Sequence, residues 1–554
     1  MRPSRVRAAL RSSDERGQAI VLIALLLTSL MGFIGLVVDV GWFQLNLVKV
    51  QRAADAAALA GSVYLPGNLP GARAAAAAAA TQNGYTDNGT TIRVTPVQDP
   101  TNDQMLNVTV TTPVRTWFMA IFGVGSISAS RNARAEFILP VPMGSPTSYY
   151  GVHILCADGD SVPAGCDQVP SAAGGSLADQ GFWGAVESHG SQRANGDAYS
   201  TYYDTPEPGG LNAGYDPLGY SYIVEFPAGT VNGRVYVFDP MFCATGAGTS
   251  GGVSGRRLGV GDAYLVSPSS AAERQQTTEY TLWDMNGTPY STGDDISIGT
   301  DGGLFTNLDN VDKGAGSVYK GNGRYDLGNS YNGSSSADCS ASPYHNAWWQ
   351  VPTPGYPSGL PAGQYRLEIK TSSGSLNQNA VNNFSLQATG GVAGVRVYGQ
   401  SRMCVFNAIS GTSIFYLAQI AAVHAGKTLQ IKLFDPGDIS NTTLYIEQPS
   451  NGIGGTYSDA TFSWTATGCS GGGCSTSGNN VTSLVTSSAG GTNYFNNQWV
   501  TINVNLPTTY AAGTPAGETG AGWWKIKYVT AGTGQDVTTW SVNIRGNPVH
   551  LVTP

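Results

Sequence analysis

Residues 17–61 read GQAIVLIALLLTSLMGFIGLVVDVGWFQLNLVKVQRAADAAALAG, and this stretch determines the first part of the fold. Its run Ala19–Val38 holds no charged residue, and only Thr28 and Ser29 in it are markedly polar. A helix of that length spans roughly 30 Å, the thickness of the hydrocarbon core of a bilayer. The run is longer than the apolar part of a cleaved signal peptide, and no A-x-A cleavage site follows it. The sequence therefore predicts an uncleaved signal-anchor helix.

The charges on either side of this run predict its orientation. Five arginines precede it, against two acidic residues, whereas the far side begins with Asp39 and has no basic residue before Lys49. Because positively charged flanks stay in the cytoplasm, we expect a single-pass protein of the cell membrane. Residues 1–16 would form a cytoplasmic basic segment, and the bulk of the chain would be extracytoplasmic.

One face of the predicted helix carries small and polar residues. Thr28, Gly32, Gly35 and Asp39 are spaced by four, three and four residues, so they share a side of the helix. Small residues let another helix approach closely in lipid, and a carboxylate at the membrane edge favours a partner. We predict that these four residues form a membrane-helix docking face. The alternative is that glycine is simply common in such helices and that Asp39 is solvated.

The helical pattern continues beyond the apolar run until Gly61 and Pro66 end it. Over residues 16–61 the chain resembles the N-terminal module of the TadE/TadG-like proteins of the tight-adherence (Flp) pilus machinery. The matching residues are Arg16, Gly17, Asp39, Gly41, Gln51, Ala53, Ala54, Asp55, Ala56, Ala57, Leu59 and Ala60.

The resemblance implies a membrane-anchored, pilin-like component of pilus assembly, with the lipid bilayer and other pilus-assembly or pilin subunits as partners. Processed type IV prepilins carry Glu five residues after the glycine at their cleavage site. Leu22 occupies that position after Gly17 here, so we expect a permanent anchor.

The composition suits an exported β-rich protein. Charged residues make up only 12% of the 554 residues, whereas there are 73 glycines, so turn-rich loops are expected and a cytosolic enzyme is not. The net charge of −8 includes the basic N-terminus, which makes the exported part more acidic still and excludes nucleic acid as an expected partner.

The seven cysteines all follow the predicted span, on the side where disulfides persist. Cys156 with Cys166, and Cys469 with Cys474, are the candidate disulfides because they are close in sequence. Three cysteines remain and at most two can pair, so one thiol is left over or bonds to a partner.

Behind the anchor segment, residues 17–62, we predict a pilin-like α+β unit over residues 63–140, with a helix at GARAAAAAAATQNGY and strands at TTIRVTPV, MLNVTVTT and SISASRNARAEFIL. The segment TWFMAIFG is expected to be a short apolar helix. Residues 141–180 are rich in Pro, Gly and Ser and form a predicted linker with an edge strand at most.

The rest of the chain contains two segments with similar sequence patterns. We predict two tandem β-sandwich or jelly-roll-like domains, at residues 181–390 and 391–554, from strands with period-2 patterning between turn residues. The recurring signals are RVYVFDP at 234–240 and QIKLFDP at 430–436, Tyr264, Pro268 and Trp283 against Tyr445, Pro449 and Trp464 at a constant offset of 181, YHNAWW at 344–349 and YFNNQW at 494–499, and GQYRLEIKTSSG with NNFSLQA against GWWKIKYVTAG with TTWSVNI.

The sequence contains few candidates for metal-binding or catalytic residues. Asp435 and Asp438, in FDPGDISNTT, are weak calcium candidates, and the alternative is that they cap backbone groups of a turn. Glu187, Ser188 and His189 are adjacent, but neighbours on a strand point to opposite faces. No nucleophile elbow, Walker loop or dinucleotide fingerprint occurs, so we expect neither an enzyme nor a required cofactor.

The recurring tryptophans are interpreted as sandwich core, with sugar platforms as the alternative. Together with these observations, the resemblance to the TadE/TadG-like module implies a non-catalytic structural or assembly component of a Flp-type pilus. The alternative is a surface adhesin or glycan-binding protein that uses a TadG-type anchor, with a surface glycan as its partner.

Overall fold

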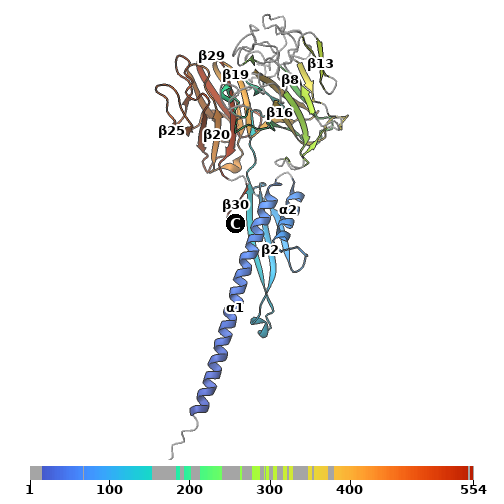
Figure 1. Ribbon diagram of the computed structural model, residues 1–554, viewed down its shortest axis with the longest axis vertical. Helices are drawn as coiled ribbons and strands as arrows, with labels where there is room; N and C mark the ends of the chain where they lie inside the picture. The colour runs from blue at the N-terminus through green and yellow to red at the C-terminus, as the bar shows by residue number, and fades with distance from the viewer. Residues whose placement is uncertain are drawn as a thin grey trace, which may run out of the picture. The chain divides into compact units, whose positions relative to one another are not determined.

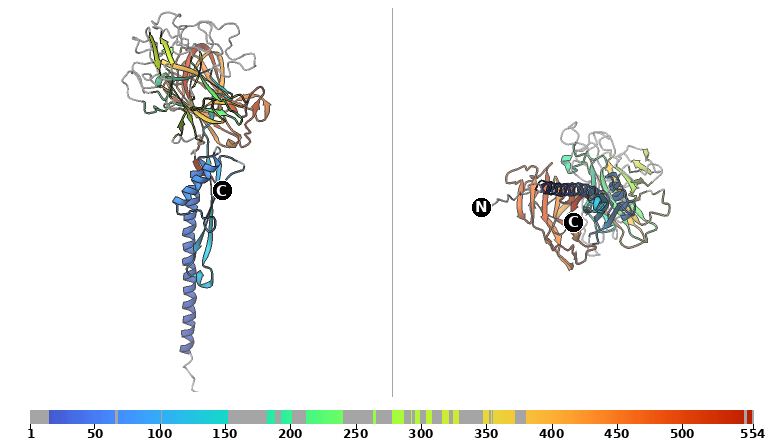
Figure 2. Two further views of the ribbon diagram at one scale, coloured as in Figure 1. Left: turned by 90° about the vertical axis from the view of Figure 1, so that its right-hand side faces the viewer. Right: turned by 90° about the horizontal axis from the view of Figure 1, so that it is seen from below.

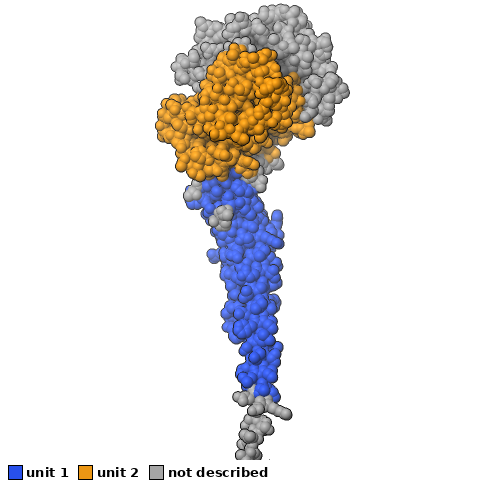
Figure 3. All heavy atoms as spheres, turned by 90° about the vertical axis from the view of Figure 1, so that its left-hand side faces the viewer, with its two compact units in different colours: residues 1–139, 547–554 blue, residues 140–546 orange. Residues whose placement is uncertain are grey.

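The computed structural model describes residues 15–65, 68–100, 102–151, 182–187, 193–200, 212–239, 263–264, 278–286, 292, 295–298, 304–307, 316–320, 324–328, 347–351, 353, 355–371, 380–546 and 549–552. The chain divides into two compact units, which Figure 3 colours separately. Unit 1 comprises Met1–Leu139 and Asn547–Pro554, and unit 2 comprises Pro140–Gly546. The predicted fold class is confirmed, because a long apolar helix and a small α+β unit precede an all-β body. Within the described ranges, only α1 and α2 are α-helices.

Helix α1, Glu15–Ser62, is continuous from the apolar run into unit 1 (Figure 1). Its first part is exposed, with Leu26 at 69%, whereas Val50, Ala54 and Ala57 further along are fully buried. By length and composition this helix can cross a membrane. One helix therefore has an apolar half suited to lipid and a second half that packs against protein.

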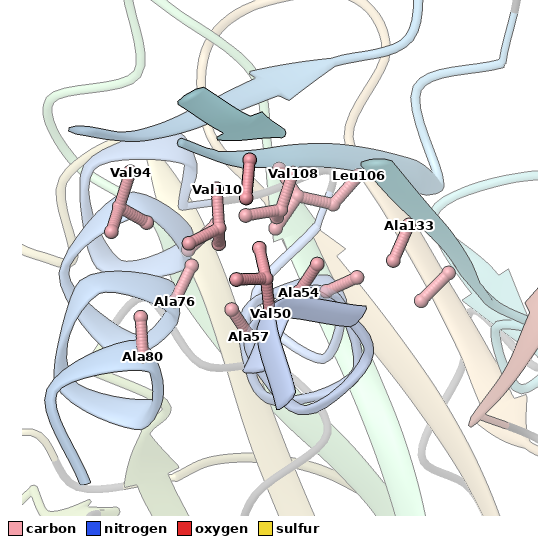
Figure 4. Close-up of a cluster of buried hydrophobic side chains, with 14 of the residues drawn as sticks. Val50, Ala54, Ala57, Ala76, Ala80, Val94, Leu106, Val108, Val110 and Ala133 are labelled. Atoms are coloured by element: carbon pink, nitrogen blue, oxygen red, sulfur yellow. The ribbon is translucent and has the colours of Figure 1, made fainter. Parts of the chain in front are cut away.

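Unit 1 is a four-stranded antiparallel sheet with two helices on one face. The strands are β1 (Arg93–Gln98), β2 (Met105–Arg115), β3 (Ser126–Phe137) and β30 (Val549–Val552), in that spatial order. Figure 4 shows α1 and α2 (Leu69–Gln82) beneath this sheet, with apolar side chains between them. Burial alternates along β2, as its period-2 pattern predicts, so Leu106, Val108 and Val110 all face the helices.

Small side chains allow the two helices to pack closely. Ala72, Ala76 and Ala80 lie four residues apart on one side of α2 and are fully buried. At the start of this helix, the side chain of Asn68 accepts a hydrogen bond from the backbone N–H of Gly71 at 2.8 Å, which caps the first turn. The alanine-rich sequence therefore forms the predicted helix, with its N-terminus set by Asn68.

The last strand of unit 1 comes from the far end of the chain. Strand β30 pairs antiparallel with β3, so that Val549 lies opposite Phe137 and Val552 opposite Arg134. The Nε2 atom of His550 is 3.4 Å from a carboxylate oxygen of Glu136 across this pair. The sequence placed residues 391–554 in a second sandwich domain, whereas the final strand belongs to unit 1.

Unit 2 is built from strands that form sandwich-like sheets, and the strands pair antiparallel except for β22 and β28, which pair parallel. In chain order they are β4 (Pro142–Met143), β5 (Tyr149–Tyr150), β6 (Trp183–Glu187), β7 (Tyr220–Phe226), β8 (Arg234–Asp239), β9 (Ala263–Tyr264), β10 (Thr278–Asp284), β11 (Ile296–Ser297), β12 (Leu304–Asn307), β13 (Gly316–Lys320), β14 (Arg324–Gly328), β15 (Ala347–Gln350) and β16 (Gly363–Thr371). There follow β17 (Ala380–Thr389), β18 (Arg396–Gln400), β19 (Arg402–Gln419), β20 (Thr428–Phe434), β21 (Thr442–Pro449), β22 (Ile453–Gly455), β23 (Tyr457–Asp459), β24 (Phe462–Ala466), β25 (Ser477–Val481), β26 (Leu484–Val485), β27 (Trp499–Asn505), β28 (Thr514–Pro515) and β29 (Trp523–Ile544).

The two halves of unit 2 repeat one pattern of strand pairing. In the first half β8 pairs with β15 and β17, and in the second half β20 pairs with β27 and the end of β29. Likewise β16 pairs with β7 and β10, whereas the start of β29 pairs with β19 and β21. The strands that carry the two FDP signals are thus equivalent, as the sequence repeat predicts.

Two of the three matches at an offset of 181 are not structural equivalents, and Pro268 of the third lies outside the described residues. Trp283 lies in β10, which pairs with β16, but Trp464 lies in β24, which pairs with β25 and β27. Tyr264 lies opposite Ala380 in β17, whereas Tyr445 lies opposite Lys527 in β29. Within the predicted linker, β4 pairs with β18 and β19 and β5 with β17, so these short strands belong to unit 2.

Candidate functional site

The β2–β3 hairpin runs along α1 and ends beside Asp39. Figures 1 and 2 show the hairpin next to the helix in two perpendicular views. Near its base the side chain of Leu106 packs against Gly61, and at its far end the backbone of Trp117 contacts Asp39. The helix between those two contacts is about 33 Å long and the strand about 36 Å. We call residues 116–125, at the end of the hairpin, the hairpin tip.

Asp39 caps the hairpin tip. One carboxylate oxygen accepts a hydrogen bond from the backbone N–H of Trp117 at 2.8 Å. The other accepts from Phe118 at 2.9 Å and from Met119 at 2.7 Å. These N–H groups open the short 3-10 helix η1, Met119–Phe122, and would otherwise lack partners within it. The side chain of Asp39 is only 2% exposed, so a charge carried by α1 is satisfied by the backbone of a loop far away in sequence.

The other members of the predicted docking face differ in their surroundings. A Cβ atom on Gly35 would lie 2.6 Å from the ring of Phe118, so this glycine makes room for the hairpin tip. A Cβ atom on Gly32 would meet nothing within 4 Å. Thr28 is exposed, and its hydroxyl donates to the carbonyl of Ala24 in its own helix at 2.8 Å. Gly35 and Asp39 thus contact their own chain, and docking on another helix stays a prediction for Thr28 and Gly32.

The sequence did not identify the tip as part of this site. The segment TWFMAIFG was expected to be a short apolar helix, and η1 forms there, but its partner Asp39 lies 78 residues earlier than Trp117. Four large apolar side chains of the tip are exposed: Trp117 at 53%, Phe118 at 42%, Ile121 at 78% and Phe122 at 82%. The sequence signal that could have indicated this surface is the uncharged run TWFMAIFG, whose large apolar side chains stay outside the core.

A second group of polar residues is buried in unit 2. Asp435, at φ 57°, follows β20, and its carboxylate accepts from the backbone N–H of Asn497 at 2.7 Å. The carboxylate of Asp438 accepts from Nδ2 of Asn493 at 2.8 Å. In the part of the chain that the structure describes, no three His, Cys, Asp or Glu side chains are arranged to hold one metal ion. The contact of Asp435 matches the alternative of backbone capping, whereas Asp438 contacts a side-chain amide, and calcium stays an untested prediction.

Buried carboxyl groups in unit 2 titrate unusually. Burial raises the pKa of Asp536 to about 8, and the nearby carboxylate of Asp438 adds to the shift. Burial likewise raises the pKa of Glu187 well above its usual range, reinforced by the carboxylate of Asp197. The hydroxyl of Tyr220 donates to Asp197 at 2.6 Å. Ser188 and His189, the sequence neighbours of Glu187, lie outside the described residues.

The cysteine predictions are resolved in part. Cys469 and Cys474 form a disulfide in the turn between β24 and β25, with Cα atoms 6.2 Å apart. Cys156 and Cys166 lie outside the described residues. Cys404 is a free, buried thiol in β19.

Two of the recurring tryptophans are buried, as the core interpretation predicts, and the side chain of Trp349 lies outside the described residues. Trp524 is fully buried and Trp464 is 7% exposed. Trp283 is half-buried beneath the guanidinium of Arg366, and Trp499 is half-buried against Phe434.

The chain was compared with known proteins on the basis of sequence and of structure. No family model and no curated protein matches it. Among solved structures, it is similar to a protein of Parabacteroides distasonis described as secreted, at 8% sequence identity. The similarity covers 75% of this chain and 90% of that one, with a TM-score of 0.12. At that score the comparison does not indicate a shared fold.

Proposed function

We propose that this chain is a membrane-anchored structural or assembly component of a Flp-type pilus in a bacterial envelope. It acts without covalent chemistry: α1 holds it in the cell membrane with the N-terminus in the cytoplasm, and the β-rich unit 2 makes contacts outside.

The observation that carries this proposal is the continuity of α1. Over 48 residues a single helix passes from an exposed apolar segment into the core of a small α+β unit. A pilin-type subunit has this layout, because its helix must both enter the membrane and carry a folded head. The resemblance of residues 16–61 to the TadE/TadG-like module points to the same system, although fold alone does not establish function.

The alternative, an adhesin or glycan-binding protein, would need an exposed aromatic ring as a sugar platform. The rings of Trp464 and Trp524 are buried, so they do not favour this alternative.

Deletion of the gene in the bacterium that encodes the chain tests the proposal. We expect surface filaments to be lost in electron micrographs and to return when the full chain is supplied. An Asp39→Ala chain should reach the membrane at a normal level without restoring filaments, because the hairpin tip is no longer held. Asp103→Ala, in an exposed turn of unit 1, is the matched control and should restore them. Normal filaments in the deletion strain would refute the proposal.

A further inference from the structure

We propose that the hairpin tip is a second membrane-contacting element, which enters the outer leaflet beside α1 while Asp39 holds it against the helix. This inference rests on the membrane anchoring in the proposed function. The tip contacts the lipid bilayer, because its apolar side chains continue the apolar surface of α1, the helix that crosses the bilayer.

The side chains of the tip suit lipid better than water. Residues 116–125, TWFMAIFGVG, include no charged residue. Ile121 and Phe122 have about four-fifths of their surface exposed, and Trp117 and Phe118 about half. Soluble surfaces rarely gather several large exposed apolar groups on one short loop, and such groups mark contact sites.

The backbone of the tip is prepared for a water-free surrounding. In lipid an unpaired N–H or C=O group is strongly unfavourable, so irregular loops seldom enter a bilayer. Here the carboxylate of Asp39 accepts from three consecutive N–H groups, and the N–H of Thr116 donates to Gly125 at 3.2 Å. Within η1, Ile121 donates to Phe118, and at its end Gly123 donates to Ala120 and Val124 to Met119, each at 3.1 Å.

The depth of the tip follows from its contacts with α1. Phe118 packs on Gly35, which lies inside the apolar run Ala19–Val38, and Asp39 immediately follows that run. The tip is therefore level with the last helical turn of the predicted span. At the boundary of the tip, the guanidinium of Arg115 lies 4.6 Å from the centre of the Trp117 ring. Tryptophan and arginine are both suited to the headgroup region, where an apolar body meets a polar tip.

Photo-crosslinking of the full chain in proteoliposomes tests this inference. Benzoylphenylalanine would replace Phe122 in one variant and Ile121 in a second. Both side chains point into open surroundings, so neither replacement should disturb the fold. Leu26 in α1, 69% exposed, is the positive position. Val97, 48% exposed in β1 and about ten residues of strand away from the tip, is the matched negative position.

We expect adducts with phospholipid from positions 122, 121 and 26 and none from position 97. Lipid adducts at position 26 alone would overturn the inference and leave the membrane anchor intact. Adducts from the tip to protein alone would also overturn it, because the surface would then belong to a partner subunit. If position 26 gave no lipid adduct either, the membrane anchoring in the proposed function would fail.

Discussion

Asp39 shows how one residue can tie distant parts of this chain together. A carboxylate near the end of an apolar helix is expected to need a partner, and the sequence suggested a second helix. The partner is instead a set of three backbone N–H groups in the chain's own hairpin tip. No local sequence pattern predicts such a contact. Backbone N–H groups occur at almost every position, and only the tertiary structure determines which three lie beside Asp39.

Asp39→Ala should loosen the hairpin tip. The replacement removes the carboxylate that accepts three charge-assisted hydrogen bonds from the tip backbone, so the local stability of the tip should fall. Hydrogen exchange of the Trp117, Phe118 and Met119 amides would measure the loss as faster exchange. Thr28→Ala, which removes only a hydroxyl bonded within α1, is the control and should leave those amides unchanged. Equal exchange in Asp39→Ala and the unmodified chain would contradict the cap.

The buried carboxyl groups of unit 2 predict an unusual response to pH. A carboxyl whose folded pKa is raised stabilises the fold fully below its unfolded pKa of about 3.9 and loses that contribution as pH rises through the folded value. For Asp536 the folded value is about 8. We therefore expect the stability of unit 2 to fall between about pH 4 and 8, by at most about 1.4 kcal/mol per pH unit for each such group.

Denaturant unfolding followed by tryptophan fluorescence, at several pH values and with a calcium chelator present, measures this response. Asp536→Asn keeps the shape of the side chain but cannot ionise, so its stability should vary less with pH. A stability that rises steadily from pH 4 to 8 in the unmodified chain would refute the predicted sign.

Close packing of the hairpin on α1 depends on the absence of a side chain at Gly35. Gly35→Ala places a methyl group 2.6 Å from the Phe118 ring and 2.9 Å from its Cβ, so rotation of the ring alone cannot relieve the overlap. We expect a cost of about 1–3 kcal/mol to the contact between tip and helix. Gly32→Ala introduces the same group where nothing lies within 4 Å and is the matched control. Limited proteolysis at the tip should be faster in the first variant only, and equal rates would count against the packing.

The returning strand β30 is the second element whose role is testable. A chain ending at Gly546 lacks the partner that pairs with Arg134–Phe137 of β3. Amide exchange in that end of β3 should accelerate and protease resistance of unit 1 should fall, whereas the strands of unit 2 should be unaffected. Unchanged protection of β3 would mean that β30 contributes little to the sheet.

Across the whole chain, the features that repeat or extend over many residues were predictable from the sequence. The apolar run, the alanine-rich helix α2 and the alternating strand β2 each carry a periodicity over many residues. The FDP strands were matched correctly because whole strands recur. Matching single residues at a fixed spacing gave a wrong equivalence. Trp283 and Trp464 are separated by the offset of 181, but their strands, β10 and β24, have different positions in the sheets.

Contacts that join distant segments were not predictable from the sequence. Strand β30 has four residues and pairs with a strand more than four hundred positions earlier, so no local pattern distinguishes it from the strands of unit 2. The exposed tip was missed for a related reason. Apolar residues in a sequence do not reveal whether a segment is buried in the protein or exposed on its surface. The large apolar side chains of TWFMAIFG are exposed.

We propose that α1 fastens the chain to the cell membrane with the later residues outside. Protease added to intact spheroplasts, followed by detection of a tag at the N-terminus, tests this topology. We expect the β-rich part to be degraded while a short membrane-bound fragment with the protected tag remains. A full-length chain that resists external protease until the membrane is lysed, or one found free of the membrane fraction, would contradict this topology.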